Sequence, residues 1–424
     1  MALSSKNFIF DKIPFYLIVL LPALLVTGPF LADSALTICA VIFLINSYKN
    51  KLVSYYKNYF FFFFIFFYIY LNISALLSDN IIFSLKTSLP YLRFGIFALC
   101  TWYVLEKNNQ LVKYILYSFL LVFLFLIIDG MYQYNFKYNL FGYPLQQDRV
   151  SSFFGDELIL GSFLSRNYPL FLGLFLFYFK KKNFQKINLI FYFTLIFIPI
   201  LIFMSGERSS TFYFILSAIY IMLYIKEKKF FIILVISFFF IFLGIFLLEN
   251  RFGDRIINQT KTQLIFDVKK SNKKFNFFSV THEQHYESAL KIFKDNLIFG
   301  AGPKSFRIKC SEERYLVSKN SCVSHPHNTY IQLLSETGII GFCLVFSLFC
   351  LLSFFSIKLL YQKYISKKNL EPIKICILAS FLITLWPIIP SGNFFTNWLN
   401  VVYYLPVGFF MWLVHKKKTV ETKY

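Results

Sequence analysis

Long apolar runs without a charged residue limit what this chain can fold into. Three of them are "IPFYLIVLLPALLVTG" (13–28), "FFFFIFFYIYL" (61–71) and "FIILVISFFFIFLGIFLL" (231–248). A helix of about 20 apolar residues crosses the hydrocarbon core of a bilayer. Hydrophobic residues make up 57% of the 424 residues, and a soluble fold of this length has no interior large enough to hide them. The sequence therefore predicts an all-α polytopic membrane protein.

The apolar segments number about twelve when the chain is searched for stretches of span length. The first segment lacks a small-residue cleavage site after a short apolar core, so it is interpreted as a retained span. The segments cover approximately residues 13–29, 31–47, 58–75, 88–105, 113–130, 158–178, 187–204, 209–225, 230–248, 335–357, 374–391 and 397–414.

The net charge of +22 has an explanation that does not involve nucleic acid. Lysine and arginine collect in the cytoplasmic connections of membrane proteins, and this chain follows that rule if its N-terminus lies in the cytoplasm. An even number of spans then returns both termini to the cytoplasm. We therefore expect membrane lipids, and no nucleic acid, as partners. The cytoplasmic lysines would be Lys6, Lys12, Lys49, Lys51, Lys57, Lys107, Lys113, Lys180 to Lys182, Lys226, Lys228, Lys229, Lys358, Lys363, Lys367, Lys368 and Lys416 to Lys418.

One long hydrophilic connection divides the chain into three regions. Residues 1–248 hold the first nine predicted spans, residues 249–334 form a large loop on the outer face, and residues 335–424 hold the last three spans and a cytoplasmic tail. Within the loop, "EQHYESALKIFKDN" (283–296) has apolar residues at helical spacing, which predicts an amphipathic helix. A loop of this length with its own structure is usually functional.

Two of the seven cysteines, Cys310 and Cys322, lie in this loop. The other five lie in predicted spans and are interpreted as packed apolar residues. An oxidising compartment would join Cys310 and Cys322 in a disulfide. The alternative is two free thiols.

Charged residues at the outer edge of the spans are candidates for function, because a charge is costly there. Arg208 lies in "SGERSS" (205–210), where small residues leave room for an anionic group and a planar guanidinium suits phosphate oxygens. Arg149, in the connection before the sixth segment, is a candidate to bind an anionic group for the same reason. The alternatives are an arginine that reaches lipid head groups, for Arg208, and an ordinary loop arginine, for Arg149. Arg93 and Arg166 lie within spans and are interpreted as structural partners of buried acids.

Histidine is scarce, with five in the chain, and two of them stand together in "SHPHN" (324–328). His325 and His327 could bind a metal, but such sites need three or four ligands. The "HEQH" stretch (282–285) lacks the i, i+4 spacing of a zinc motif, so we expect no metal and no other cofactor. His327 can instead act as a general base, since neutral imidazole accepts a proton near neutral pH. The alternative is a polar cap, together with Asn328, at the start of a helix.

The pair His327-Asn328, followed after nine residues by Gly338-x-x-Gly341, resembles the signature of the O-antigen ligase and polymerase superfamily. The two glycines are one helical turn apart and are expected to allow close contact between helices. The resemblance implies a fold similar to the C-type membrane glycosyltransferases. Three further stretches also resemble this family, namely "RVSSFFGDELILGSFLS" (149–165), "SGERSS" (205–210) and "IFGAGPKSFR" (298–307).

Members of this family transfer a glycan from undecaprenyl diphosphate to a sugar hydroxyl at the periplasmic face of the bacterial inner membrane. The acceptor is lipid A–core in the ligases and a second lipid-linked repeat in the polymerases. We expect the ligase reaction here, with the polymerase reaction as the alternative. A lipid-glycan flippase is less favoured, because its charges would line a cavity through the spans rather than gather at one edge.

The resemblance implies roles for particular residues. His327 and Arg208 are expected to be catalytic in an inverting, metal-independent transfer. Relatives commonly carry an arginine before "IFGAGP", where this chain has "THEQHYESAL" (281–290), so that role is open here, with His285 as a candidate. The residues expected to bind substrate are Arg149, Asn328, His325, Arg307 and Lys304.

Overall fold

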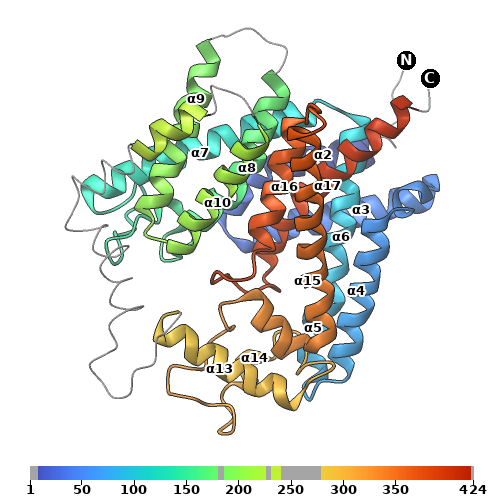
Figure 1. Cartoon of the computed structure of the whole chain (residues 1–424), viewed down its shortest axis with the longest axis vertical. Helices are drawn as coiled ribbons and strands as arrows, with labels where there is room; N and C mark the ends of the chain where they lie inside the picture. The colour runs from blue at the N-terminus through green and yellow to red at the C-terminus, as the bar shows by residue number, and fades with distance from the viewer. Residues whose placement is uncertain (1–7, 180–185, 226–230, 240–277, 422–424) are drawn as a thin grey trace.

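The computed structural model of the chain describes residues 8–179, 186–225, 231–239 and 278–421 (Figure 1). Within these ranges the chain is helical and contains no β-strand, which confirms the predicted all-α class. The long helices pack beside one another in a bundle. Two shorter helices, α13 (Val280–Asp295) and α14 (Phe306–Lys309), lie across one end of it, against the start of α15 (Figure 1).

The bundle consists of helices that match the predicted apolar segments. Short helices lie between them, namely η1 (Phe8–Lys12), η2 (Val53–Tyr56), α5 (Ile81–Ser88), η3 (Leu89–Tyr91) and η4 (Ser152–Phe154). Residues 231–239 are also helical. The long elements are α2 (Ile13–Thr27), α3 (Pro29–Asn50), α4 (Tyr59–Leu76), α6 (Leu92–Lys107), α7 (Leu111–Phe136), α8 (Leu160–Phe179), α9 (Lys186–Met204), α10 (Arg208–Tyr224), α15 (Thr329–Tyr364), α16 (Pro372–Thr384) and α17 (Asn397–Glu421).

The number of membrane spans is confirmed only in part. Seven helices in the described ranges are long and apolar enough to cross a membrane, and Leu189–Met204 and Pro372–Thr384 are shorter apolar helices. The chain is therefore a multi-pass membrane protein. The total of about twelve stays a prediction, because α8 and α10 mix polar residues with apolar ones. The predicted segment 230–248 also lies partly outside the described residues.

Short sequence signals set the ends of these helices. Gly28 has φ 134°, a conformation open to glycine, and separates α2 from Pro29, the first residue of α3. Asn58 caps α4 by accepting a hydrogen bond from the backbone N–H of Phe61 (2.8 Å). Asn328 caps α15 in the same way through the N–H groups of Tyr330 and Ile331. These caps satisfy donors that the first helical turn leaves without a partner.

The eleventh predicted segment is helical only in its first half. α16 ends at Thr384, and residues 385–396 form an irregular connection to α17, because two prolines and a glycine in this stretch oppose a continued helix. The polar groups of this connection bind the start of α15. The backbone N–H of Ser391 donates to the carbonyl of His327 (2.8 Å), and the Asn328 side chain donates to the carbonyl of Pro387 (2.8 Å).

The outer loop is joined to α15 by direct contact between two backbones. Ala301 donates its N–H to the Ser335 carbonyl (2.9 Å), Gly302 donates to Glu336 (2.9 Å), and Ile339 donates to Leu297 (2.9 Å). Three backbone hydrogen bonds therefore join residues 297–302 to residues 335–339, at the point where Gly338 interrupts the helix.

Two glycines make this approach possible. Gly338 interrupts α15 with φ 65° and ψ −170°, and Gly300 has φ 71°. A Cβ at Gly300 would overlap the backbone of Thr337, and a Cβ at Gly338 would overlap the backbone of Ile298. The expectation that Gly338 serves contact between helices is therefore corrected: it serves contact between the loop and the helix backbone. Gly341 lies near Tyr70 of α4, a helix contact.

The outer loop also has a small core of its own. Cys310 and Cys322 form a disulfide, so the alternative of two free thiols does not hold. The bridge closes a separation of 12 residues directly before the two histidines of "SHPHN". The buried apolar residues of this core are Ala289, Ile292, Ala301, Phe306, Cys310 and Tyr315.

We expect Gly300→Ala to destabilise the protein more than Gly142→Ala. Both glycines have positive φ (71° and 84°), so both substitutions strain the backbone, at about 1 kcal/mol each. Gly142 has nothing within 4 Å of an added Cβ, whereas Gly300 lies against the backbone of α15. Separating the two segments would lose further backbone hydrogen bonds, at about 1 kcal/mol each. Thermal unfolding of the purified protein in detergent measures the difference, and equal melting temperatures would contradict the backbone contact.

Candidate functional site

Four of the five histidines gather at the end of the bundle that carries α13. The ring centroids of His325 and His327 lie 4.1 Å apart. The His327 ring is 5.5 Å from that of His282 and 5.6 Å from that of His285, and the latter two are 6.2 Å apart. The fifth, His415, packs on Trp102 near the other ends of α6 and α17. The structure thus joins residues that are separated by about forty positions in the chain into one cluster.

Helix α13 supplies His282 and His285 from one face, because residues three apart in a helix are neighbours. The Ser279 side chain caps this helix by accepting from the N–H of His282, and it also contacts His282 Nδ1 (2.6 Å). His285 is 5% exposed, and its Nδ1 lies 3.1 Å from the Ser321 carbonyl oxygen. A carbonyl only accepts, so Nδ1 carries the proton and Nε2 is left as the acceptor nitrogen.

The loop before α15 supplies His325 and His327. His327 has φ 58°, a conformation that few residues other than glycine adopt and that clusters at functional sites. It is held there because its carbonyl accepts from Ser391 and because Asn328, the next residue, is fixed on both sides. The Asn328 amide, expected to bind substrate, is buried and uses its oxygen to cap α15 and its nitrogen to bind Pro387. The structure gives Asn328 a positioning role instead.

Three of the four imidazoles in this cluster are held neutral. Burial lowers the pKa of His327 to about 4, with a smaller contribution from His285. Burial, followed by the neighbouring His327, lowers the pKa of His325 to about 3. Burial, the two nearest histidines and the Arg208 guanidinium lower the pKa of His282 to about 4. Neutral imidazole can accept a proton, so the cluster suits a general base at neutral pH.

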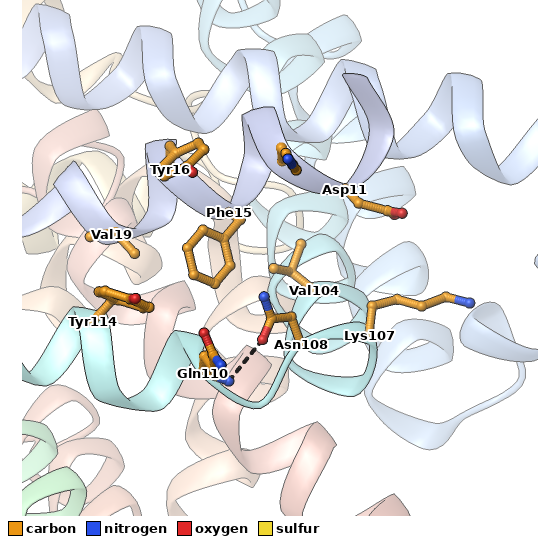
Figure 2. A pocket seen from close by; sticks show the side chains of 10 residues that line it. Asp11, Phe15, Tyr16, Val19, Val104, Lys107, Asn108, Gln110 and Tyr114 are labelled. Atoms are coloured by element: carbon orange, nitrogen blue, oxygen red, sulfur yellow. Dashed lines mark hydrogen bonds between the residues drawn. The ribbon is translucent and has the colours of Figure 1, made fainter. Parts of the chain in front are cut away.

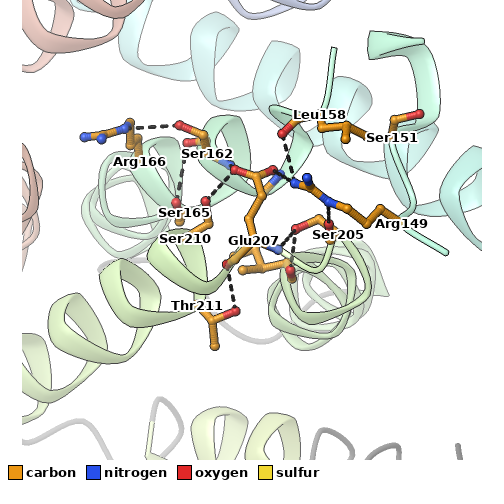
Figure 3. A network of polar contacts seen from close by, with 12 residues as sticks. Arg149, Ser151, Leu158, Ser162, Ser165, Arg166, Ser205, Glu207, Ser210 and Thr211 are labelled. Atoms are coloured by element: carbon orange, nitrogen blue, oxygen red, sulfur yellow. Dashed lines mark hydrogen bonds and ion pairs between the residues drawn. The ribbon is translucent and has the colours of Figure 1, made fainter. Parts of the chain in front are cut away.

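Arg208 is the first residue of α10, and its guanidinium is close enough to the cluster to lower the pKa of His282. The turn before it contains Gly206 with φ 65°, and it is held by the Glu207 carboxylate (Figure 3). Glu207 accepts from the N–H groups of Gly161 (2.7 Å) and Ser162 (3.1 Å), which are at the start of α8. The same carboxylate accepts from the Ser210 hydroxyl (2.8 Å). Glu207 therefore joins α8 to α10 and fixes the position from which Arg208 starts.

Arg149 belongs to the same network. Its Nε donates to the Ser205 carbonyl (2.8 Å), one terminal nitrogen donates to the Leu158 carbonyl (3.2 Å), and the side chain lies 4.0 Å from the Glu207 carboxylate (Figure 3). The structure brings Arg149 to the turn that precedes Arg208. Two nitrogens of Arg149 already donate to backbone carbonyls, so Arg149 helps to hold this turn in place.

The two arginines within spans differ from each other. Arg93 forms a two-pronged pair with Asp33, with nitrogen–oxygen distances of 2.8 to 3.1 Å. Arg166 is 3% exposed and lies over the rings of Tyr213 (4.6 Å) and Tyr403 (5.4 Å). An acid partner was expected for both. Among the described residues, Arg93 forms an ion pair with an acid and Arg166 does not, while aromatic faces stabilise the charge of Arg166.

Lys304 and Arg307 lie on the loop that pairs with α15. The Glu336 carboxylate, fully buried in α15, accepts from the N–H groups of Lys304 (3.0 Å) and Phe306 (3.1 Å). Lys304 is partly buried with φ 62°, and Arg307 is exposed. Burial and the neighbouring Arg307 lower the pKa of Lys304. Arg307 also contributes to the lowered pKa of His325, so its charge acts on the histidine cluster.

No group of three or more His, Cys, Asp or Glu side chains in the described ranges is arranged to hold a metal ion. A cavity of about 620 Å³ lies between the start of α2, the end of α6 and the start of α7 (Figure 2). Lys107, which lines this cavity, is in the last turn of α6, and Arg93 is in the first turn, about 20 Å away along the helix. The cavity is therefore separate from the histidine cluster.

The sequence indicated His325, His327 and Arg208; the structure places the rings of His325 and His327 in contact and Arg208 near His282. It did not place His282 at the site and left His285 open. The available signal was the i, i+3 spacing of "HEQH" on an amphipathic helix, which puts both rings on one face. The irregular connection 385–396 was missed because its apolar composition resembles a span.

Residues 193–346 match the family model described as O-antigen ligase. The matched range contains α10, α13, α14 and the start of α15, and so all of the histidine cluster and Arg208. Among curated proteins, none is significantly similar to the chain.

We expect Glu207→Gln to destabilise the protein and to reduce the function of Arg208. An amide has one oxygen in place of two, so at least one N–H or hydroxyl donor at the start of α8 or α10 loses its partner. A hydrogen bond to a charged group contributes about 2 kcal/mol. Glu157→Gln is the matched control, because Glu157 lies in the preceding connection and is exposed. Thermal unfolding of both variants measures the effect, and a melting temperature of Glu207→Gln equal to that of the control would refute this role.

Proposed function

We propose that this chain, whose residues 193–346 match the O-antigen ligase family model, transfers a glycan from undecaprenyl diphosphate to a sugar hydroxyl. The acceptor in this proposal is lipid A–core or a related glycolipid. The observation that carries the proposal is that His282 links the two residues at one end of a membrane helix bundle: its ring is 5.5 Å from that of His327, and the Arg208 guanidinium is close enough to lower its pKa. A base and a fixed cation on either side of one residue match the two requirements of the reaction.

Arg208 meets the requirement at the leaving group. When the bond between the anomeric carbon and the diphosphate breaks, the electron pair leaves with the diphosphate, which gains negative charge. A guanidinium held by a rigid turn stabilises that charge as it develops, which is worth about 3 kcal/mol for one such donor. Glu207 and Arg149 hold the turn from which Arg208 projects.

His327 meets the requirement at the nucleophile. The acceptor hydroxyl attacks the anomeric carbon from the side opposite to the diphosphate, and its proton passes to the neutral imidazole. The configuration at that carbon is therefore inverted. General base catalysis of this kind contributes a factor of roughly 10²–10⁴.

Substrate binding also raises the pKa of the histidines in the cluster in this proposal. An imidazole with a pKa of about 4 is a weak base at neutral pH. A bound diphosphate brings negative charge beside the rings, and a nearby opposite charge favours the protonated form of histidine. The pKa of the cluster therefore rises when the donor binds, towards the pH at which the enzyme works.

The proposed location is the bacterial inner membrane, with the site at the periplasmic face. The disulfide between Cys310 and Cys322 lies at the end of the bundle that carries the site and fits an oxidising compartment. Lys49, Lys107 and Lys363 lie at the other ends of α3, α6 and α15, where the positive-inside rule expects the cytoplasm.

We expect His327→Ala and Arg208→Ala each to reduce glycan transfer at least about 100-fold. The variants are expressed in cells that lack the native gene, and surface glycan is separated on a gel. Loss of all ladder bands, with long polymer retained on carrier lipid, is the result expected for a ligase. His415→Ala and Arg314→Ala are the matched controls, since both residues lie away from the cluster. A core that carries one repeat would favour the polymerase reaction, and a full ladder with either variant would remove its assigned role.

We expect kcat/KM to stay constant between about pH 6 and pH 8 and to fall as the pH approaches 4. The base form of His327 is present above its pKa, which burial lowers to about 4, and it is lost as the pH falls through that value. Initial rates are measured over this range, with circular dichroism at each pH to show that the protein stays folded. An inflection near 6.5, the ordinary value for histidine, would show that the ring is solvated in the free enzyme.

A further inference from the structure

We propose that the aromatic hairpin, residues 137–146 between α7 and α8, inserts into the outer leaflet of the membrane at the level of the lipid head groups. The partner of this surface is bilayer phospholipid, which goes beyond the glycan transfer proposed above. Three observations carry the proposal: the exposed apolar side chains of the hairpin, its continuity with the lipid-facing side of α7, and the hydrogen bonding of its backbone within the protein.

The hairpin leaves its large apolar side chains exposed. The side chain of Phe141 is 74% exposed, although phenylalanine is among the most apolar residues. Lys137 is the one charged residue between positions 130 and 147. A surface that faces water rarely gathers exposed apolar side chains of this size with so little charge. The other exposed large apolar side chains of this segment are those of Phe136, Tyr138, Leu140 and Tyr143.

These side chains continue the lipid-facing side of α7, a helix long and apolar enough to cross a membrane. Leu121, Phe125 and Ile128 are 56% to 60% exposed, and their spacing of four and three residues puts them on one side of the helix. Phe136 comes eleven positions after Phe125, which is close to three full turns, so it returns to the same side. The hairpin begins at the next residue. The surface of α7 that faces lipid therefore runs directly into it.

The length of α7 places the hairpin at the level of the head groups. The helix has 26 residues and is about 39 Å long, whereas the hydrocarbon core of a bilayer is about 30 Å thick. Lys113, in its first turn, marks the proposed cytoplasmic side. The last turns of α7 then reach the outer head groups, where aromatic side chains with a polar end are enriched. Tyr138 and Tyr143 are side chains of this kind.

The backbone of the hairpin is satisfied without water. Every backbone N–H from position 139 to position 145 donates to an acceptor within the protein, and Pro144 has none to donate. The buried Asn139 side chain accepts two of these hydrogen bonds, from Phe141 (3.0 Å) and Tyr143 (2.8 Å). Three more go to backbone carbonyls of the hairpin itself. Lipid offers no hydrogen bonds, so a segment that faces it needs partners of this kind.

Two fully buried polar residues of α7 fix the hairpin and the chain after it. The Asp129 carboxylate accepts from the N–H of Leu140 (2.9 Å) and from the hydroxyl of Ser152 (2.6 Å). The Gln133 side-chain oxygen accepts from the N–H groups of Ser151 (2.9 Å) and Ser152 (2.7 Å). The polar groups are thus used against the bundle, and the apolar side chains are left for the membrane.

The hairpin is also joined to the turn that carries Arg208. Gln146 pairs with Arg149, and Arg149 Nε donates to the carbonyl of Ser205 in that turn (2.8 Å). Insertion of the hairpin therefore sets the depth of the turn in the membrane. For the proposed reaction, this depth is that of lipid head groups, where the diphosphate of a lipid-linked donor lies.

Tryptophan fluorescence in phosphatidylcholine vesicles tests the depth of the hairpin. The full-length Phe141→Trp variant is measured, and the signal of the wild type, which has four tryptophans, is subtracted. We expect lipid brominated near the head group to quench the added tryptophan more strongly than lipid brominated near the chain end, and aqueous iodide to quench it weakly. Phe125→Trp, in the middle of α7, should show the reverse order for the two lipids. Lys319→Trp, exposed in the outer loop, should respond to iodide alone.

Tyr138→Trp, in the same hairpin, should show the same order of quenching and keeps the test valid if the first variant fails to fold. Strong quenching by iodide with none by brominated lipid at both positions would place the hairpin in water and overturn the proposal. Protection from both quenchers would show a cover of protein, such as a second copy of the chain, and would overturn it as well. The measurement needs neither donor nor acceptor, so its failure is distinct from a failure of the proposed function.

Discussion

The buried carboxylate of Glu336 ties the outer loop to the membrane bundle, and the geometry of the site depends on it. A carboxylate without exposure is costly unless its oxygens accept hydrogen bonds. Here they accept from the loop at Lys304 and Phe306 and from Gln332 of the same helix. Gln332 in turn donates to Asn393 and accepts from the N–H of Phe394 in the connection between α16 and α17. One polar network thus positions the loop, the start of α15 and the irregular connection that supports His327.

The second constraint is electrostatic. The candidate site gathers four imidazoles, and Arg208 and Arg307 are close enough to lower the pKa of two of them. Burial and mutual repulsion keep three of the rings neutral in the free protein. In the proposed reaction, the negative charge of the donor would both bind the guanidinium and raise the pKa of the rings, so that donor binding would also prepare the base.

The sequence was sufficient for the parts of the fold that follow from local composition. Apolar runs of span length located the long helices, although α7, α15 and α17 extend six or seven residues beyond the predicted segments and the predicted segment 374–391 is not helical after Thr384. There, apolar residues form a connection rather than a helix, because prolines at 387 and 390 remove donors and the polar backbone groups bind α15 instead. The sequence singled out Gly338 but predicted the wrong contact for it. Its spacing from Gly341 is compatible with contact between helices and with contact to a loop, and only the approach of residues 297–302 shows that the second is present.

What the sequence determined by itself was a helical membrane protein, the position of His327 at the start of a span, and Arg208 at a small-residue turn. These follow from periodicity, charge and short motifs, which act over a few residues. Only the tertiary structure decided that α13 brings His282 and His285 against His327, that Glu207 and Arg149 hold the turn before Arg208, and that the backbone of Lys304 and Phe306 is fixed to α15 through Glu336. These are contacts between segments far apart in the chain, and they arise from packing and from buried hydrogen bonds, which no local pattern specifies.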